Sequence, residues 1–177
     1  VLLRGEVGAG PVRLGAHVVL DVWEDGLDPA RVGVMGFSAG GHVAASLSTR
    51  FDDAVYAPVD AADRLSARPD FALLIYPVID MGNAIGHTGS RKRLLGPHPD
   101  AQLVHDYSMQ NHVSARTPPT FLLAAQDDDV VPVQNTLVYE QALLGAGVSS
   151  ELHIFPKGGH GFGVRRIQGL TLAAWPR

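Results

Sequence analysis

The feature that most constrains the fold is the alternation of short apolar runs with helix-like stretches. Four runs are rich in β-branched and aromatic residues and are bounded by glycine, proline or aspartate: residues 32–37, 71–76, 120–125 and 151–155. Such runs are typical of strands covered on both faces, as in parallel sheets. Helical spacing of apolar residues, or an alanine-rich composition, marks residues 12–27, 40–49 and 132–145. The alternation predicts an α/β fold, with a parallel sheet flanked by helices.

Length and composition limit the function classes. The 177 residues fit one domain, so we expect residues 1–177 to form a single domain. The net charge of −4 gives no basic surface for nucleic acid or anionic lipid, and no apolar run reaches the roughly 18 residues of a membrane-spanning helix. The absence of cysteine excludes disulfides and thiolate metal sites. These features predict a soluble protein and leave its compartment, cytoplasmic or secreted, undecided.

Two stretches without a regular pattern, residues 50–69 and 80–118, are too long for plain connectors. Loops of this length in a compact domain are usually functional, as lids or pocket walls. The second stretch follows the carboxyl end of the second predicted strand and contains His87 and Ser90. We therefore expect residues 80–118 to wall a substrate pocket, with His87 and Ser90 as pocket residues.

A serine motif lies between the first predicted strand and the helix after it. Residues 36–40 read Gly-Phe-Ser-Ala-Gly, which fits G-x-S-x-G, and in a strand–turn–helix context this is the pattern of a nucleophile elbow. We expect Ser38 to be the nucleophile, and any side chain at Gly36 or Gly40 to clash with neighbouring backbone. The Ala39 amide is the predicted first donor of an oxyanion hole. A chance pentapeptide is the alternative, which the flanking strand and helix argue against.

A serine hydroxyl needs a base, and the base needs an orienting acid. Behind this kind of elbow, the acid follows the serine in the chain and the histidine follows the acid. His160 fits best, because it lies in a glycine-rich stretch directly after the last predicted strand, whereas His153 lies inside that strand. The acid is expected among the aspartates at residues 127–129, after the third predicted strand. Chain order alone does not choose among these three.

Several stretches point together to one family. They include residues 26–42 around the serine motif, the Leu-Ile-Tyr-Pro-Val-Ile of residues 74–79, residues 87–96 and 117–122, residues 127–133 with Val-Val-Pro, and the Pro-Lys-Gly-Gly-His-Gly of residues 156–161. The chain thus resembles the α/β-hydrolase superfamily esterases that include acetylxylan and feruloyl esterases, the BD-FAE-like, xylanase-associated esterases and lipases. The family motif implies Ser38 as nucleophile and His160 as base. It places the acid four residues before the proline of Val-Val-Pro, at Asp128.

The resemblance implies a serine carboxylic ester hydrolase that acts on small-acyl esters through an acyl-enzyme, with acetylated xylan-type sugars as candidate substrates. No metal or cofactor is implied, and the partner is a small-molecule or carbohydrate ester. Two alternatives stay open. One is a peptidase or dienelactone-type hydrolase of the same fold; the other is a non-catalytic fragment that lacks a complete oxyanion hole.

The resemblance also implies parts that this sequence does not contain. Family members carry several strands and a glycine-rich oxyanion loop ahead of the residue that corresponds to Gly26, and a last helix beyond the match to residue 177. The chain therefore resembles a core truncated at both ends, with N-terminal strands missing and no identified second oxyanion donor. We expect the strand at residues 32–37 to lie at a sheet edge, covered by residues 1–23 or by a second copy in a homo-oligomer. The alternative is that a longer native chain supplies the missing strands.

Overall fold

A four-stranded parallel sheet forms the centre of the computed structural model, which describes residues 31–165 and 167–175. The strands are β1 (Gly33–Phe37), β2 (Phe71–Ile75), β3 (Thr120–Ala125) and β4 (Ser150–Phe155), and they lie in the order β1-β2-β3-β4. Each neighbouring pair is parallel. The four predicted strands and the α/β class are confirmed. The helix expected at residues 12–27 lies outside the described residues.

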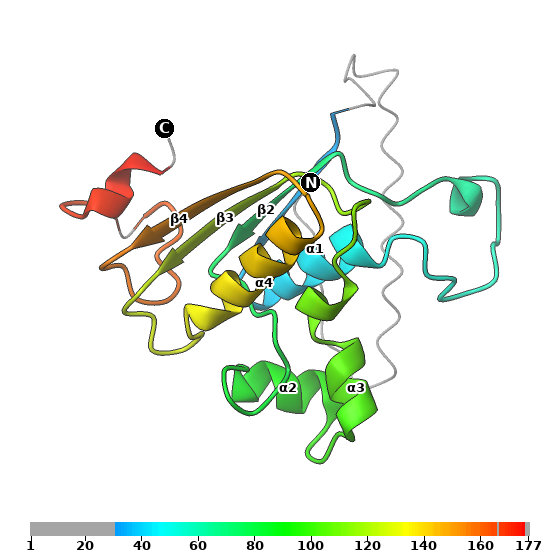
Figure 1. Cartoon of the computed structure of the whole chain (residues 1–177), viewed down its shortest axis with the longest axis horizontal. Helices are drawn as coiled ribbons and strands as arrows, with labels where there is room; N and C mark the ends of the chain where they lie inside the picture. The colour runs from blue at the N-terminus through cyan, green and yellow to red at the C-terminus, as the bar shows by residue number, and fades with distance from the viewer. Residues whose placement is uncertain (1–30, 166, 176–177) are drawn as a thin grey trace.

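Helices α1 (Ala39–Thr49) and α4 (Gln134–Gly145) lie against one face of the sheet (Figure 1). They bury a core there with Leu74 and Leu122 of the central strands. The next residues along these strands, Ile75 and Leu123, pack with Phe162 and with η3 (Thr171–Ala174) in a second core. Because successive side chains of a strand point to opposite faces, β2 and β3 are buried on both sides. This explains why their sequences are continuous apolar runs.

Helix α4 does not bury the side that carries Leu137 and Leu144. Leu137 and Leu144 are 42% and 65% exposed. The buried side consists of Asn135, Thr136, Tyr139 and Leu143. The helix has apolar residues on both sides, and the buried one includes Asn135, whose side-chain amide bonds backbone groups at the site. Tertiary hydrogen bonding therefore outweighs the apolar periodicity here.

Strand β1 differs in exposure from the central strands. Within residues 31–165 and 167–175 it pairs with β2 alone, and Met35 and Phe37 are 43% and 36% exposed. In β3, Leu122, Leu123 and the alanines that follow are buried. The proposed cover for the β1 edge, residues 1–23, lies outside the described part of the chain.

The segment from residue 80 to 118 is more regular than its sequence indicates. It forms α2 (Thr88–Leu95), α3 (Ala101–Asp106) and η2 (Met109–His112), while residues 50–69 contain the short η1 (Ala62–Arg64). Side chains cap the two α-helices at their starts. Helices of one or two turns offer too few residues for a periodic signal, so the pattern missed them. None of the described helices is long and apolar enough to cross a bilayer.

Candidate active site

The serine turn, residues 36–41, connects β1 to α1 and presents Ser38. Ser38 has a φ of 53°, in the left-handed region that non-glycine residues seldom adopt. Two backbone bonds hold it: its N–H donates to the Ile75 carbonyl at 3.0 Å, and its carbonyl accepts from the Val78 N–H at 3.0 Å. Such a conformation costs on the order of 1–3 kcal/mol and persists only where its surroundings enforce it, typically at functional sites.

Close packing of backbone enforces the serine turn. A Cβ on Gly36 would lie 2.2 Å from the Gly40 carbonyl oxygen, so the prediction for Gly36 is confirmed. The prediction for Gly40 is wrong, because no described atom lies within 4 Å of a Cβ built there. The close approach falls one residue later, at Gly41, whose Cβ would lie 2.7 Å from the Pro77 side chain. The Gly40 carbonyl packs against Gly36, and Gly41 packs against Pro77 in the segment after β2. The two consecutive glycines were the sequence feature that indicated this close packing.

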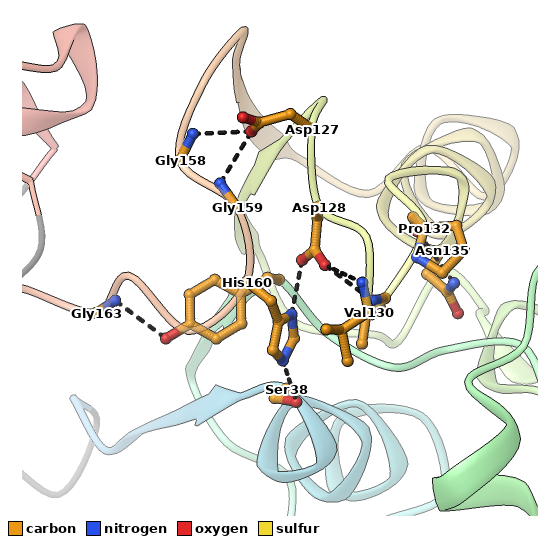
Figure 2. A network of polar contacts seen from close by, with 12 residues as sticks. Ser38, Asp127, Asp128, Val130, Pro132, Asn135, Gly158, Gly159, His160 and Gly163 are labelled. Carbon is orange, nitrogen blue, oxygen red and sulfur yellow. Dashed lines mark hydrogen bonds and ion pairs between the residues drawn. The ribbon is translucent and has the colours of Figure 1, made fainter.

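Ser38, His160 and Asp128 converge as predicted. The His160 Nε2 atom lies 2.8 Å from Ser38 Oγ, and its Nδ1 lies 2.7 Å from Asp128 Oδ2 (Figure 2). A carboxylate only accepts, so Nδ1 carries the proton and the neutral ring leaves Nε2 as the acceptor for the serine hydroxyl. The Asp128 side chain is 1% exposed and that of His160 17%. The arrangement can take a proton from Ser38 and keep the resulting imidazolium beside a carboxylate.

Asp128 is fixed by its own loop. Its Oδ1 accepts from the N–H groups of Val130 at 3.0 Å and Val131 at 2.8 Å. These bonds occupy one carboxylate oxygen and leave Oδ2 for His160. These two bonds orient the Asp128 carboxylate independently of its contact with the His160 imidazole.

Sequence reasoning did not find the role of Asp127, which it weighed only as an alternative acid. Its Oδ1 accepts from the N–H groups of Gly158 at 2.8 Å and Gly159 at 2.9 Å, and its Oδ2 lies 3.6 Å from Lys157 Nζ (Figure 2). The hydrogen bond from Gly159, together with the one from Gly158 and the nearby positive charge of Lys157, holds the pKa of Asp127 below its usual range. The neighbouring carboxylates thus bind different parts of the same loop.

Tyr76 lies on the other side of His160. Its hydroxyl accepts from the Gly163 N–H at 3.2 Å, and its ring centroid is 5.0 Å from that of His160. The Tyr76 ring also meets Phe162 edge-on, with centroids 4.6 Å apart. Like Ser38, Tyr76 has a positive φ, of 38°. Burial raises the pKa of its hydroxyl, which therefore stays protonated.

Asn135, also missed, joins the acid loop to the segment after β2. Its Oδ1 accepts from the N–H groups of Ile79 and Asp80 at 2.9 and 3.0 Å. Its Nδ2 donates to the Ile85 and Pro132 carbonyls at 2.7 and 3.1 Å. The residue is fully buried, and all its amide groups have partners. No periodic pattern marks such a residue, because three of its four partners are backbone groups at least 50 residues away in the chain.

An open cleft of about 410 Å³ lies beside His160. Its lining residues are Phe37, His160, Gly161, Phe162, Gly163, Val164 and Arg165. Ala39 is exposed and is the first residue of α1. N–H groups in the first turn of a helix have no acceptor within the helix and carry its positive dipole end, so the Ala39 amide suits a developing negative charge.

His87 and Ser90 pair with each other. The His87 Nδ1 accepts from the Ser90 N–H at 3.2 Å and thereby caps the start of α2; the same atom lies 2.9 Å from Ser90 Oγ. Neither residue is among those that line the cleft at His160. Their role in a substrate pocket stays a prediction.

One group of side chains in the described ranges has the composition of a metal site. His105, Asp106 and His112 each offer one ligand atom, and these atoms lie within 4.8 Å of one another. The Asp106 carboxylate already accepts from the Gln102 amide at 2.8 Å. None of these residues contacts Ser38, Asp128 or His160.

Comparison with known proteins identifies the family. Residues 19–143 match the family model described as BD-FAE. The chain belongs to the BD-FAE family. This member is 38% identical over 164 residues to an acetylxylan esterase of Xylanibacter ruminicola, covering 89% of the chain and 31% of that protein. It is 38% identical over 138 residues to endo-1,4-beta-xylanase B of Butyrivibrio fibrisolvens, covering 78% and 21%. It thus spans less than a third of these curated relatives.

Solved structures agree with this family. An acetyl ester-xyloside bifunctional hydrolase from Caldicellulosiruptor lactoaceticus is 48% identical, with a TM-score of 0.78 over 84% of this chain and 54% of that one. The carboxylesterase Cest-2923 from Lactobacillus plantarum is 26% identical, with a TM-score of 0.65 over 88% and 58%. This BD-FAE member therefore has the α/β-hydrolase fold, as predicted.

Proposed function

We propose that this chain is the catalytic part of a serine carboxylic ester hydrolase that acts on small-acyl esters. The observation that carries the proposal is the continuous contact from Ser38 Oγ to His160 Nε2, and from His160 Nδ1 to the buried Asp128 carboxylate. The relatives named above, an acetylxylan esterase and an acetyl ester-xyloside hydrolase, support an ester substrate and an acetyl group. Acetylated xylan-type sugars are the substrate class that we propose.

The geometry supports the following reaction. Ser38 Oγ attacks the ester carbonyl carbon while its proton passes to His160 Nε2, and the oxyanion that forms is stabilised by the Ala39 N–H. When the carbon–oxygen bond to the alcohol breaks, the alcohol leaves with the proton from His160, and the acyl group stays on Ser38. A water molecule then attacks the acyl-enzyme, its proton again passing to His160. The second tetrahedral intermediate releases the carboxylic acid and restores the Ser38 hydroxyl.

A fluorophosphonate probe tests the nucleophile, because it reacts covalently with an activated serine. We expect mass spectrometry of the labelled full chain to place one adduct on Ser38. The Ser38→Ala and His160→Ala variants should not be labelled, while Ser46→Ala, which changes another serine of the first helix, should label like wild type. A wild-type chain that resists the probe would favour the non-catalytic fragment.

Substrate comparison tests the ester class. We expect p-nitrophenyl acetate to be hydrolysed faster than the octanoate ester, and acetyl release from acetylated xylan to depend on Ser38. Peptide p-nitroanilides serve as the competing substrate. Faster cleavage of the anilide than of the acetate would replace the esterase proposal by the peptidase alternative.

A further inference from the structure

The backbone conformation of the histidine loop, residues 157–163, is not fixed by close packing around its glycines. Gly159, Gly161 and Gly163 have positive φ values of 62°, 73° and 50°. A Cβ built on Gly159 or Gly161 would meet no described atom within 4 Å. Glycine has more backbone freedom than any other residue, and no close packing restricts these two. Something else must keep the His160 ring pointed at Ser38.

Hydrogen bonds from outside the loop supply this restraint on both sides of His160. Ahead of it, one oxygen of Asp127 accepts from two successive N–H groups, those of Gly158 and Gly159. Behind it, the Tyr76 hydroxyl accepts from the Gly163 N–H, and the Tyr76 ring lies against the imidazole. Asp127 follows β3 and Tyr76 follows β2, so the two sides of the loop are tied to the two central strands.

We propose that Asp127 and Tyr76 are positioning residues that clamp the histidine loop and hold His160 within reach of Ser38. This inference rests on the proposed function, because it assigns these residues to the orientation of the base. Neither Asp127 nor Tyr76 is within hydrogen-bonding contact of Ser38; both act through the loop. Asp127 thereby differs from Asp128, which binds the imidazole itself.

The conformation of Tyr76 and the contacts of Asp127 both fit this role. Tyr76 is a bulky residue in the left-handed region, which is unusual for a side chain of its size and typical of strained functional positions. In this conformation the Tyr76 hydroxyl binds the Gly163 amide and its ring lies against His160. The Asp127 carboxylate accepts hydrogen bonds from two amides of the histidine loop and forms an ion pair with Lys157 of the same loop. Its charge is committed to that loop.

The central test compares Asp127→Ala with Asp127→Asn in the full chain. Alanine removes the acceptor, and a displacement of the base by about 1 Å lowers kcat roughly 100-fold. We therefore expect Asp127→Ala to lower kcat for p-nitrophenyl acetate about 10- to 100-fold, with a nearly unchanged KM. The Asp127→Asn variant keeps one oxygen that can accept both N–H groups, so most activity should be retained. Asp129→Ala, which removes the exposed neighbouring carboxylate, is the matched control and should behave like wild type.

Tyr76→Phe tests the other side of the loop. It removes the acceptor for Gly163 and keeps the ring against His160, so we expect a smaller loss of kcat than with Asp127→Ala. Tyr56→Phe removes an exposed hydroxyl elsewhere and is the control. Because both clamp residues act on one loop, their effects should not be independent. The fold-loss of kcat in the double variant should therefore differ from the product of the two single fold-losses.

A background without the base distinguishes positioning from general stability. In His160→Ala, residual turnover measured at high enzyme concentration should be the same with and without Asp127→Ala. An equal fold-loss in both backgrounds would overturn the proposal, because it would show that Asp127 does not act through His160. Thermal unfolding of every variant shows whether the assay samples folded protein.

NMR of the His160 Nδ1 proton separates this inference from the proposed function. We expect a slowly exchanging downfield signal in wild type that weakens or broadens in Asp127→Ala and persists in Asp129→Ala. If wild type neither hydrolyses esters nor reacts with fluorophosphonate, the proposed function fails, and this signal still decides the clamp. An unchanged signal together with unchanged kcat in Asp127→Ala would overturn the clamp while leaving the esterase intact.

Discussion

The serine turn and the histidine loop follow the two outer strands of the described sheet, β1 and β4, and hold their side chains by different means. In the serine turn, backbone packs so closely that Gly36 and Gly41 leave no room for a Cβ. In the histidine loop, Gly159 and Gly161 have space around them, and side chains from the central strands bind the loop amides. The serine turn is thus held by close backbone packing together with backbone hydrogen bonds, and the histidine loop by hydrogen bonds to side chains. Substitution of the tightly packed glycines in the first region should chiefly lower stability, and loss of the side chains that bind the second region should chiefly lower activity.

The largest expected effect is on the hydrogen-bonded side. In Asp128→Asn, the single oxygen is retained by the Val130 and Val131 amides, which turns the NH₂ group toward His160 Nδ1. The imidazole must then accept at Nδ1 and carry its proton on Nε2, the wrong tautomer for taking a proton from Ser38. The corresponding change in a serine protease lowers kcat about 10⁴-fold. We expect a loss of that order, with nearly unchanged thermal unfolding.

Steady-state kinetics of Asp128→Asn and Asp129→Asn measure this difference. Asp129 is exposed and makes no contact with His160 among the described residues, so its variant should stay within a few-fold of wild type. Equal losses in both variants would contradict the assignment of the acid.

The second prediction tests the steric side with two glycines of the same motif. Gly36→Ala places a methyl group 2.2 Å from a backbone oxygen, and such overpacking costs about 3 kcal/mol of unfolding free energy. Gly40→Ala adds a methyl group where no described atom is near, in the first turn of α1, and gains up to about 1 kcal/mol from helix propensity. Urea unfolding measures both. A stable, active Gly36→Ala variant would break the comparison between the two regions.

The third prediction concerns the open glycines of the histidine loop. Gly159→Ala forces alanine to a φ of 62°, at a cost of about 1–2 kcal/mol. Asparagine tolerates this region better, so Gly159→Asn should lose less stability and retain more activity. Unfolding and kcat measured for both variants check the order. If alanine were the milder substitution, the positive φ of Gly159 would not set the cost of a side chain at this position.

The smallest expected effect is a dependence of the free energy of unfolding on pH through His42 of α1. His42 is buried, and its Nε2 donates to the Tyr107 carbonyl at 2.9 Å. Burial lowers its pKa, the bond to Tyr107 opposes this, and the nearby Arg50 charge adds to the lowering. The folded state therefore prefers neutral His42, and below pH 6.5 the unfolded state takes up the proton more readily.

Stability from His42 is thus complete above pH 6.5 and is lost as the pH falls toward its pKa in the folded state, with a slope of at most about 1.4 kcal/mol per pH unit. Urea unfolding of wild type and His42→Gln between pH 8 and 5 measures it. We expect the stability difference between the two proteins to shrink as the pH falls. A difference that stays constant over this range would show that His42 does not titrate in the unfolding reaction.

The sequence was sufficient for features that depend on chain order and topology. Parallel strands bring their carboxyl ends to one edge of the sheet, so groups after β1, β3 and β4 had to lie near one another, and Ser38, Asp128 and His160 do. It was insufficient for features that depend on where a backbone amide points. The division of labour between Asp127 and Asp128 depends on where the amides of Gly158 and Gly159 and the ring of His160 point, which a run of three aspartates does not reveal. The same limit explains the one-residue error at Gly40 and Gly41.

The order of the strands across the sheet is also their order in the chain, and this has a consequence for synthesis. Ser38 is translated 122 residues before His160, the partner that contacts its hydroxyl. In a nascent chain on the ribosome, Ser38 therefore lacks its base until β4 and the histidine loop have emerged and packed against the sheet. A message that terminates between the codons for Asp128 and His160 yields a product with the elbow and the acid but no base. The hydrolase that we propose becomes active only after the loop that carries His160 has been made and has packed against the sheet.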